Sequence, residues 1–571
     1  MKHRRTLVAV AAALALPAVH AFDITVPDPD VKVRLDLTPK YSTAVRLKDP
    51  SPALTRLDVA VDPGTVNEDD GDHNFQKGQI SNRFDLLTEL DVTGKNFGGR
   101  ISATTWHDAV YLRNNNYQGT PVYAGGVNTG GIYPLANNNV STQAPNQFLQ
   151  ATRDQQGQGS EILDAFVYAK GDVGNMRGTV RLGKHTLQWG ESLFFGQNGI
   201  ANAQGPVDVA KIVSVPGWQF KEVLLPVEQA SGSLQVAEGV SLGAYYQFKW
   251  RPSKIPGVGS FYSNQDYVGT GIVNFGAGGN LSYDPSKDLK PKDSGQGGVQ
   301  LRWSPTGSDY EFGFYAANYH DKTPGAPVFD FVNGNVHLAY ASDIRTYGAS
   351  VTSSIGQLNW AVEGSIRENA PLNSDPAVLG LGPITTCGNS SADPCFAVGR
   401  TGHLQVSGIY VLQPNALWQG GAVLGELAFN RTLSITKDIF APYAGMGLGG
   451  LDPNTTRDAF AFRMLFEPQY FQVFPGLDLS VPIGLGYNFG GRSSAVANFA
   501  GGASNAGDFS IGIKGKYQNA WNFALTYSDF FGPAKTFTQT LVAGSGSPRQ
   551  LSFGQTLADR ANISFTVSRT F

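Results

Sequence analysis

The sequence contains few cysteines, few charged residues and no long hydrophobic run after its N-terminal region. The first and the last of these shortages each exclude a class of protein. Two cysteines in 571 residues exclude a disulfide-built scaffold and a four-cysteine zinc site. Charged residues account for 16 % of the chain, against roughly 25 % in soluble domains. Beyond the N-terminal region, no uncharged apolar stretch reaches the roughly 18 residues of a membrane-spanning helix, so a helical membrane protein is excluded.

The residues that are abundant narrow the choice further. The chain holds 69 glycines and 32 prolines, which argue against a helix bundle. Its 43 basic and 46 acidic side chains give a formal net charge of −3, so nucleic acid is not an expected partner. The composition therefore favours a β-rich chain over a helical or nucleic-acid-binding one.

The N-terminus matches a secretory signal peptide over residues 1–21. Its basic start consists of Lys2, Arg4 and Arg5. An apolar stretch from Leu7 to Ala18 follows, and small or tolerated residues precede an expected cleavage site between Ala21 and Phe22. A short membrane anchor, the alternative, would need a longer apolar run. We therefore expect an exported protein.

A period of two recurs along the chain, and helical periodicity is almost absent. Apolar residues occupy every second position of 240–250, 358–366 and 521–527, while many positions between them carry charged or amide side chains. In lipid every backbone N–H and C=O must be paired, so such strands of about 10 residues have to close into a barrel. We predict an all-β protein in which residues 22–571 form a single transmembrane antiparallel β-barrel.

The spacing of turns predicts the size of this barrel. Eight hairpins with short turns, together with the first and last strands, give about 18 strands, with about 16 as the alternative. Short turns on one side and long loops on the other are typical of an outer-membrane barrel, with the long loops outside the cell. The longer segments are 48–81, 112–160, 188–230, 251–296, 321–342, 369–401, 432–457, 488–505 and 531–560.

A soluble periplasmic sandwich or propeller would show the same alternation, so other features have to decide. Residues 563–571 alternate and end in Phe571, which resembles the C-terminal strand by which Gram-negative outer-membrane barrels are recognised for insertion; Arg569 departs from the usual apolar residue. Aromatic residues near strand ends fit interface girdles: they are Trp106, Tyr168, Trp250, Trp303, Tyr517 and Trp521. We expect the protein in the outer membrane of a Gram-negative bacterium, in contact with lipid and lipopolysaccharide.

The central part of the chain closely resembles an outer-membrane family catalogued as domain of unknown function 1302. The motifs that carry the resemblance are Trp189-Gly190-Glu191-Ser192, Asn198-Gly199-Ile200, Pro206-Val207-Asp208-Val209 and Lys221-Glu222-Val223-Leu224-Leu225-Pro226-Val227. The resemblance implies an outer-membrane protein, often encoded beside a periplasmic partner and efflux-type transporters in bacteria that degrade hydrophobic compounds. The family has no settled activity, so no catalytic residue is implied.

Segment 188–230 is too apolar for a loop that stands unshielded in water. A barrel of this size is wide enough for a channel, so we predict that the segment folds inward as a constriction or plug. A cap of loops packed on one another outside the pore is the alternative. Residues expected to pair with the wall or line the path are Arg181, His185, Glu191, Asp208, Lys211, Lys221 and Glu222, with Arg83, Asp85, Glu89, Glu363, Arg367, Lys514 and Lys516 on the wall.

An oxygen-rich run surrounds Gly71 in the first long loop. Asp69, Asp70 and Asp72 offer the hard ligands that calcium prefers, although their spacing is not that of an EF-hand. The alternative is an acidic loop that is exposed to solvent and binds no metal. We expect no cofactor.

The two cysteines enclose seven residues of the 369–401 loop. In an oxidising compartment Cys387 and Cys395 should pair. We expect a local staple for this loop and no redox role.

No catalytic motif occurs, and passage through a barrel needs no covalent chemistry. We therefore predict a non-enzymatic channel or transporter for a small hydrophobic or amphipathic compound. One alternative is a non-conducting barrel that scaffolds a periplasmic or efflux partner. Another is an outer-membrane hydrolase that assembles Ser, His and a carboxylate from separate strands.

Overall fold

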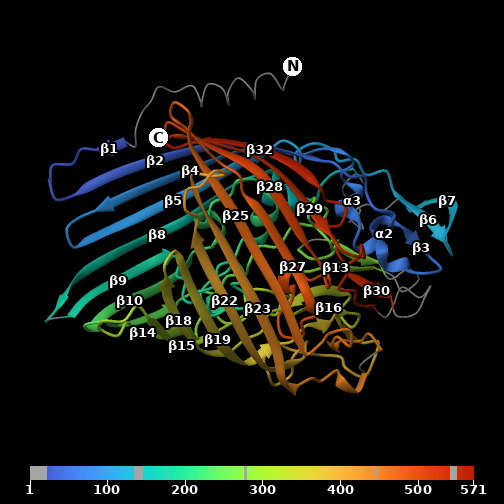
Figure 1. Ribbon diagram of the computed structural model, residues 1–571. Coiled ribbons are helices and arrows are strands. Elements are labelled where there is room, and N and C mark those ends of the chain that lie inside the picture. The colour runs from blue at the N-terminus through green and yellow to red at the C-terminus, as the bar shows by residue number, and fades with distance from the viewer. Residues whose placement is uncertain are drawn as a thin grey trace.

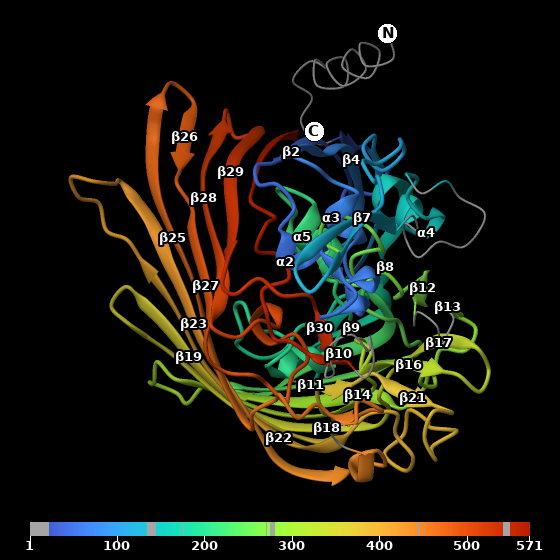
Figure 2. The ribbon, with the colours of Figure 1, turned by 90° about the vertical axis from the view of Figure 1, so that its right-hand side faces the viewer.

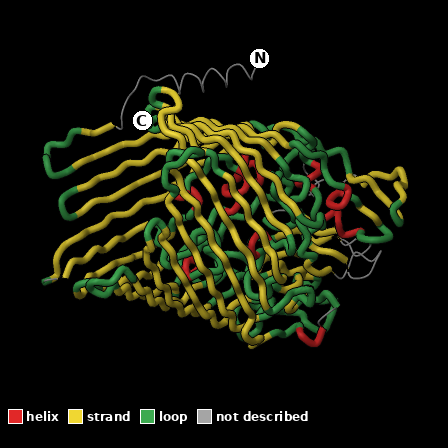
Figure 3. Tube along the Cα trace, viewed as in Figure 1, coloured by secondary structure: helices red, strands yellow, loops and turns green. Residues whose placement is uncertain are grey.

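The computed structural model describes residues 22–133, 144, 146–174, 176–269, 271–274, 280–443, 446–540 and 549–571. Strands dominate this part of the chain, and they wind around one axis (Figures 1 and 3). None of its helices is long and apolar enough to cross a membrane. The expected signal peptide, 1–21, lies outside the described residues.

Long antiparallel strands form the wall, and each one after the first follows its neighbour along the chain. They are β2 (Lys32–Arg46), β4 (Gly78–Thr93), β5 (Phe97–Asp108), β8 (Gln158–Val173), β9 (Met176–His185), β10 (Val227–Ala237), β11 (Val240–Gln247), β14 (Gln296–Trp303), β15 (Glu311–Tyr319), β18 (Ile344–Ile355), β19 (Leu358–Pro371), β22 (Val398–Val411), β23 (Gly420–Lys437), β25 (Asp458–Phe474), β26 (Leu477–Ser480), β27 (Ile483–Gly491), β28 (Ala506–Tyr517), β29 (Trp521–Phe531) and β32 (Asn562–Arg569).

The ring closes because β32 pairs with both β29 and β2, for example Thr566 with Ser42. The strand β1 (Phe22–Ile24) pairs only with the start of β2. Strands β26 and β27 are two pieces of one wall strand, separated around Pro482, because proline cannot donate to the ladder. Nineteen of the 20 strands in this sheet therefore lie in the wall, and because β26 and β27 count as one, the wall has eighteen strands, as predicted. Closure excludes the sandwich and propeller alternatives.

The two faces of the wall have opposite chemistry, as strand β19 shows. Its Val362 and Ile366 point outward, and Ile366 is 43 % exposed. Its Glu363 and Arg367 point inward, and they are only 2 % and 5 % exposed. Apolar side chains outside and buried polar side chains inside are the reverse of a soluble protein and fit a barrel embedded in lipid.

The hairpin turns gather at one end of the barrel and the long loops at the other, as the turn spacing predicts (Figure 1). The loops carry short helices and side sheets. The helices are α2 (Pro52–Thr55), α3 (Asp70–His73), α4 (Gln150–Thr152), α5 (Val209–Ser214) and α6 (Phe220–Val223). The largest side sheet contains β12 (Ile272–Asn274), β13 (Asn280–Tyr283), β17 (Asn335–Ala339), β16 (Ala326–Asp330) and β21 (Ala377–Leu379).

The unusual arginine of the final strand is shielded by aromatic rings. The guanidinium of Arg569 lies 5.1 Å from the ring centroid of Trp521 and 4.4 Å from that of Phe571. Phe571 exchanges backbone hydrogen bonds with Leu37 of β2, so pairing continues to the last residue. Cation–π contact lets an outward-facing arginine sit at the edge of the apolar band.

Candidate functional site

Segment 188–230 has its own local order. Asp208 caps α5 by accepting a hydrogen bond from the backbone N–H of Lys211 at 2.8 Å, and Glu222 accepts from the N–H of Gln219 at the start of α6. The ammonium of Lys211 donates to the carbonyl of Glu222 at 3.3 Å, and burial lowers the pKa of Lys211. These bonds hold the two short helices together, and Figure 2 shows α5 inside the ring of strands.

Two carboxylates of the wall bind the backbone of this segment. Glu363 of β19 accepts from the N–H of Glu191 at 2.6 Å and of Ile200 at 2.7 Å. Gly190, with φ of 89°, allows this approach because a Cβ there would collide with the Glu363 carboxylate. Glu426 of β23 accepts from the Ser192 hydroxyl at 2.9 Å; it also accepts the backbone N–H groups of residues 193–195. Charged acceptors thus satisfy buried N–H groups that have no strand partner.

A second set of bonds surrounds Asn198. Its side-chain amide donates to the Phe429 carbonyl at 3.2 Å, and its oxygen lies 3.1 Å from Nδ1 of His403 and accepts from Asn430 at 3.2 Å. Arg367 donates to the carbonyls of residues 197 and 199, each at 2.8 Å. Strands β19, β22 and β23 therefore form an anchoring wall for the segment, and we use that name for these three strands.

Other parts of the segment contact strands elsewhere around the ring. Glu191 pairs with Arg302 of β14 at 3.2 Å, and Lys221 pairs with Glu89 of β4. The carboxylate of Glu222 lies 3.9 Å from the ammonium of Lys40 on β2. The backbone also approaches β32: at Gly217, where φ is 65°, a Cβ would meet Thr566 at 3.2 Å. The segment thus runs across the interior from one side of the barrel to another.

Three of the residues expected along the path face inward but contact the wall. Arg181 lies over the ring of Phe166, with its guanidinium 4.6 Å from the ring centroid. Nε2 of His185 lies 2.7 Å from the Ser231 hydroxyl. Arg83 pairs with Asp85 at 2.8 Å on its own strand. Asp208 also lies outside the main anchor, 3.6 Å from Lys254 of the next loop.

Sequence reasoning missed Glu426, which among the described wall carboxylates accepts the most hydrogen bonds from the segment. Its place on the polar side of an alternating strand shows that it faces inward. Its role, however, depends on where the backbone of residues 192–195 passes, and no pattern in β23 reveals that path. The motifs around Gly190 and Gly199 are the sequence feature that could have indicated this close approach to the wall. Both glycines lie against wall side chains with which a Cβ would collide.

A cavity of about 220 Å³ lies between the segment and another part of the wall. Strands β28, β29 and β32 contribute a hydroxyl- and amide-bearing side, namely Ser510, Thr526, Ser528, Asn562 and Ser564. The opposite side is mostly apolar and includes Val213, Val215, Pro216, Trp218, Phe261 and Tyr262. No charged side chain lines this cavity in the part of the chain that the structure describes.

The acidic run of the first long loop divides into two groups. Asp72 pairs with Arg46 at 3.0 Å and with Arg560, both buried. Asp69 and Asp70 instead meet Asp266 of the 251–296 loop, with one oxygen of each carboxylate within 4.8 Å of the others. The trio that the fold assembles therefore differs from the predicted set by one residue.

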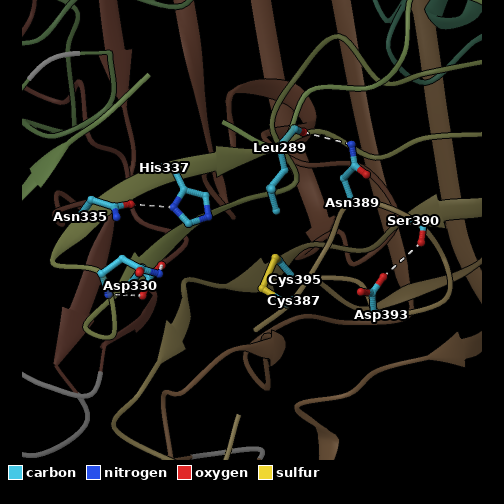
Figure 4. The surroundings of a disulfide bond; sticks show 10 residues. Leu289, Asp330, Asn335, His337, Cys387, Asn389, Ser390, Asp393 and Cys395 are labelled. Atoms are coloured by element: carbon cyan, nitrogen blue, oxygen red, sulfur yellow. Dashed lines mark hydrogen bonds between the residues drawn. A yellow bond between two sulfur atoms is a disulfide. The ribbon is translucent and has the colours of Figure 1, made fainter. Parts of the chain in front are cut away.

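The two cysteines form the expected disulfide (Figure 4). Their sulfurs are 2.09 Å apart in the 369–401 loop. Cys395 is fully buried in a cluster with Phe396 and Val398, beside the five-stranded side sheet. The bond fixes this outer loop.

The fold and its chemistry define the class: a closed 18-stranded outer-membrane β-barrel with an apolar exterior and chain inserted in its interior. Within that class, the chain belongs to the family described as protein of unknown function (DUF1302), which matches residues 2–571. No curated protein matches it.

Solved barrels with similar folds are distant in sequence. Acinetobacter baumannii OccAB4 is 8 % identical, with a TM-score of 0.41, and the match covers 96 % of this chain and all of that one. Pseudomonas aeruginosa OpdK, solved with vanillate, is 10 % identical with a TM-score of 0.39, covering 94 % and 98 %. Pseudomonas aeruginosa OccK11 (OpdR) is 9 % identical with a TM-score of 0.39, covering 94 % and 96 %.

Proposed function

We propose that this protein is a non-enzymatic channel in the outer membrane of a Gram-negative bacterium that admits a small apolar or amphipathic compound. Residues 1–21 would be removed on export, and segment 188–230 would form the constriction. The observation that carries this proposal is the uncharged cavity between that segment and strands β28, β29 and β32.

The lining of the cavity suits a molecule with one apolar and one hydrogen-bonding side. Trp218, Phe261 and Tyr262 offer flat apolar surface, and the hydroxyls of Ser510 and Thr526 face them from the wall. An ion entering this space would lose hydration without meeting a countercharge, which is costly. A neutral amphipathic molecule keeps its hydrogen bonds on one side and gains apolar contact on the other.

The charges of the segment support a positioning role. Glu191 and Lys221 pair with Arg302 and Glu89 of the wall, so these groups hold the chain across the interior. Glu363 and Arg367 bind its backbone. Selection would therefore rest on the uncharged cavity, while the ion pairs keep the constriction in place.

The decisive experiment measures single-channel conductance in planar bilayers for the full chain and for a variant without residues 191–225. We expect a small conductance that rises several-fold on deletion, because the segment crosses the interior. Absence of conductance in both forms would overturn the channel and favour a scaffold for a periplasmic partner. Since the deletion removes buried surface, the double substitution Glu363→Ala and Glu426→Ala, which leaves the chain intact, serves as a second test.

A further inference from the structure

Three carboxylates from two loops that are distant in the sequence meet in a buried place among the outer loops. Asp69 is the N-cap residue of α3, Asp70 begins that helix, and Asp266 belongs to the 251–296 loop. The three residues are 1 %, 1 % and 0 % exposed, and one oxygen of each lies within 4.8 Å of the others. Like charges this close repel strongly at low dielectric unless something offsets them.

The free oxygens of this trio form a second, independent observation. Oδ2 of Asp266 accepts the backbone N–H groups of Asp69 at 2.9 Å and Asp70 at 3.2 Å. Oδ1 of Asp266 and Oδ1 of Asp69 accept no hydrogen bond from any residue that the structure describes, although both are buried. Buried polar atoms are almost always satisfied, so two orphan carboxylate oxygens in one cluster indicate a missing partner.

The cationic side chains nearby do not supply that partner. Nε2 of His73 lies 3.3 Å from Oδ2 of Asp69, the oxygen that is not orphaned. Arg46 and Arg560 pair with Asp72, and Arg549 pairs with Asp62 and Glu68.

We propose that Asp69, Asp70 and Asp266 bind one divalent cation, with calcium as the best fit. All three ligands are hard oxygens, whereas zinc sites in proteins are built largely on thiolate and imidazole. Calcium accepts irregular sets of carboxylate and carbonyl oxygens, whereas magnesium demands near-octahedral geometry and retains several waters. This inference does not rest on the proposed channel function.

The site would join loops that cover the cavity. The 251–296 loop that carries Asp266 also brings Phe261 and Tyr262 to the cavity lining. The hydroxyl of Thr120, from the 112–160 loop, donates to Asp69 at 3.4 Å. A cation bound here ties three outer loops to one another and leaves the contacts of Glu363 and Glu426 untouched.

The test uses the full mature protein in detergent micelles after removal of metal with EDTA. Terbium is the probe, because nearby tyrosines can sensitise its luminescence. Tyr267 directly follows Asp266, and the ring of Tyr117 lies 5.7 Å from that of His73, the side chain beside Asp69. We expect saturable binding of one terbium per chain and its displacement by calcium at millimolar concentration or below. We also expect calcium to raise the melting temperature of the metal-free protein.

Variants decide whether the trio is responsible. Asp266→Asn should weaken terbium binding at least tenfold, and Asp284→Asn, a change in the same loop away from the trio, should leave it unchanged. Retained β-sheet circular dichroism shows that each variant folds. Terbium binding that survives in Asp266→Asn, or no binding at all, overturns the proposal; in the second case shared protons would hold the carboxyls together, and Asp266→Asn would stabilise the protein without metal.

Discussion

Two parts of the same barrel wall present different side chains to the interior. On the anchoring wall of β19, β22 and β23, inward-facing charged and amide side chains are buried and bonded to segment 188–230. On β28, β29 and β32, the inward-facing residues that line the cavity are mainly hydroxyl-bearing and half-buried. Among the described residues, Ser510, Thr526 and Ser528 make no hydrogen bond to the segment.

The outward faces of these two parts are alike, so lipid does not cause the difference. Each wall presents apolar residues outward, for example Leu404 and Leu427 on one and Ile511 and Leu525 on the other. The inward side chains alone determine where the inserted chain is held and where space remains. A barrel can thus separate anchoring from passage by varying every second residue of a few strands.

The largest effect should come from breaking the anchor at Glu426. Glu426→Ala leaves three buried backbone N–H groups and the Ser192 hydroxyl without their acceptor, at about 1–3 kcal/mol each. We expect the segment to detach, the conductance to rise several-fold and the melting temperature to fall. Planar-bilayer recording and thermal denaturation measure the two changes.

A matched control lies on β25, next to the anchoring wall. Glu467 also faces inward, but its partners, Lys514 and Ser480, belong to the wall. Glu467→Ala should leave the conductance close to that of the parent protein. An equal rise in both variants would show that any lost carboxylate opens the pore and that the anchor has no special role.

The next effect tests the other wall by placing a charge in the cavity. Ser528→Asp should slow entry of a neutral amphipathic probe into liposomes roughly tenfold, which corresponds to about 1.4 kcal/mol. Asn522→Asp adds the same charge to the same face of β29 outside the cavity and should have little effect. If the two variants behave alike, the cavity is not on the path.

A smaller effect is expected from a change outside both walls. Replacing Cys387 and Cys395 by serine should lower the local stability of the 369–401 loop by about 2–3 kcal/mol, because the closed loop is short. Hydrogen exchange should show faster opening of this loop alone. The conductance should stay unchanged, and a change would mean that the outer loops govern the passage more than the anchor does.

The smallest effect concerns pH and the pair formed by Asp375 and Asp452 in the outer loops. Burial and the neighbouring Asp452 raise the pKa of Asp375 to about 10, so the folded protein retains a proton there that the unfolded chain releases near pH 4. This contribution is fully present below pH 4 and is lost as the pH rises toward 10.

Asp375→Asn cannot ionise, so its stability should depend less on pH. From pH 6 to pH 9 the melting temperature of the parent protein should fall about 2 °C further than that of the variant. Asp393→Asn, an exposed change in the same 369–401 loop that affects at most a hydrogen bond from Ser390, should follow the parent. Parallel curves for all three proteins would contradict the shared proton.

The sequence predicts only some of the features that distinguish the two parts of the wall. Alternation at 358–366 placed Glu363 and Arg367 on the inner face, and the apolar character of 188–230 left two arrangements open, inside the pore or above it. In the structure, Glu363 accepts hydrogen bonds from the backbone of Glu191 and Ile200, and these two residues are part of a segment that crosses the interior. Asp266 shows the limit most clearly, because it lies almost 200 residues from Asp69 and no local pattern links them.

The sequence by itself determined the class of fold, since a period of two needs only local alternation and the bilayer leaves such strands no other way to pair their backbones. It also determined the disulfide, because two cysteines close in one exported loop have only each other. Tertiary structure alone decided which wall holds the inserted segment, where the uncharged cavity lies and which carboxylates meet. Those outcomes depend on contacts between residues far apart in the chain, and their energies appear only once the barrel has closed.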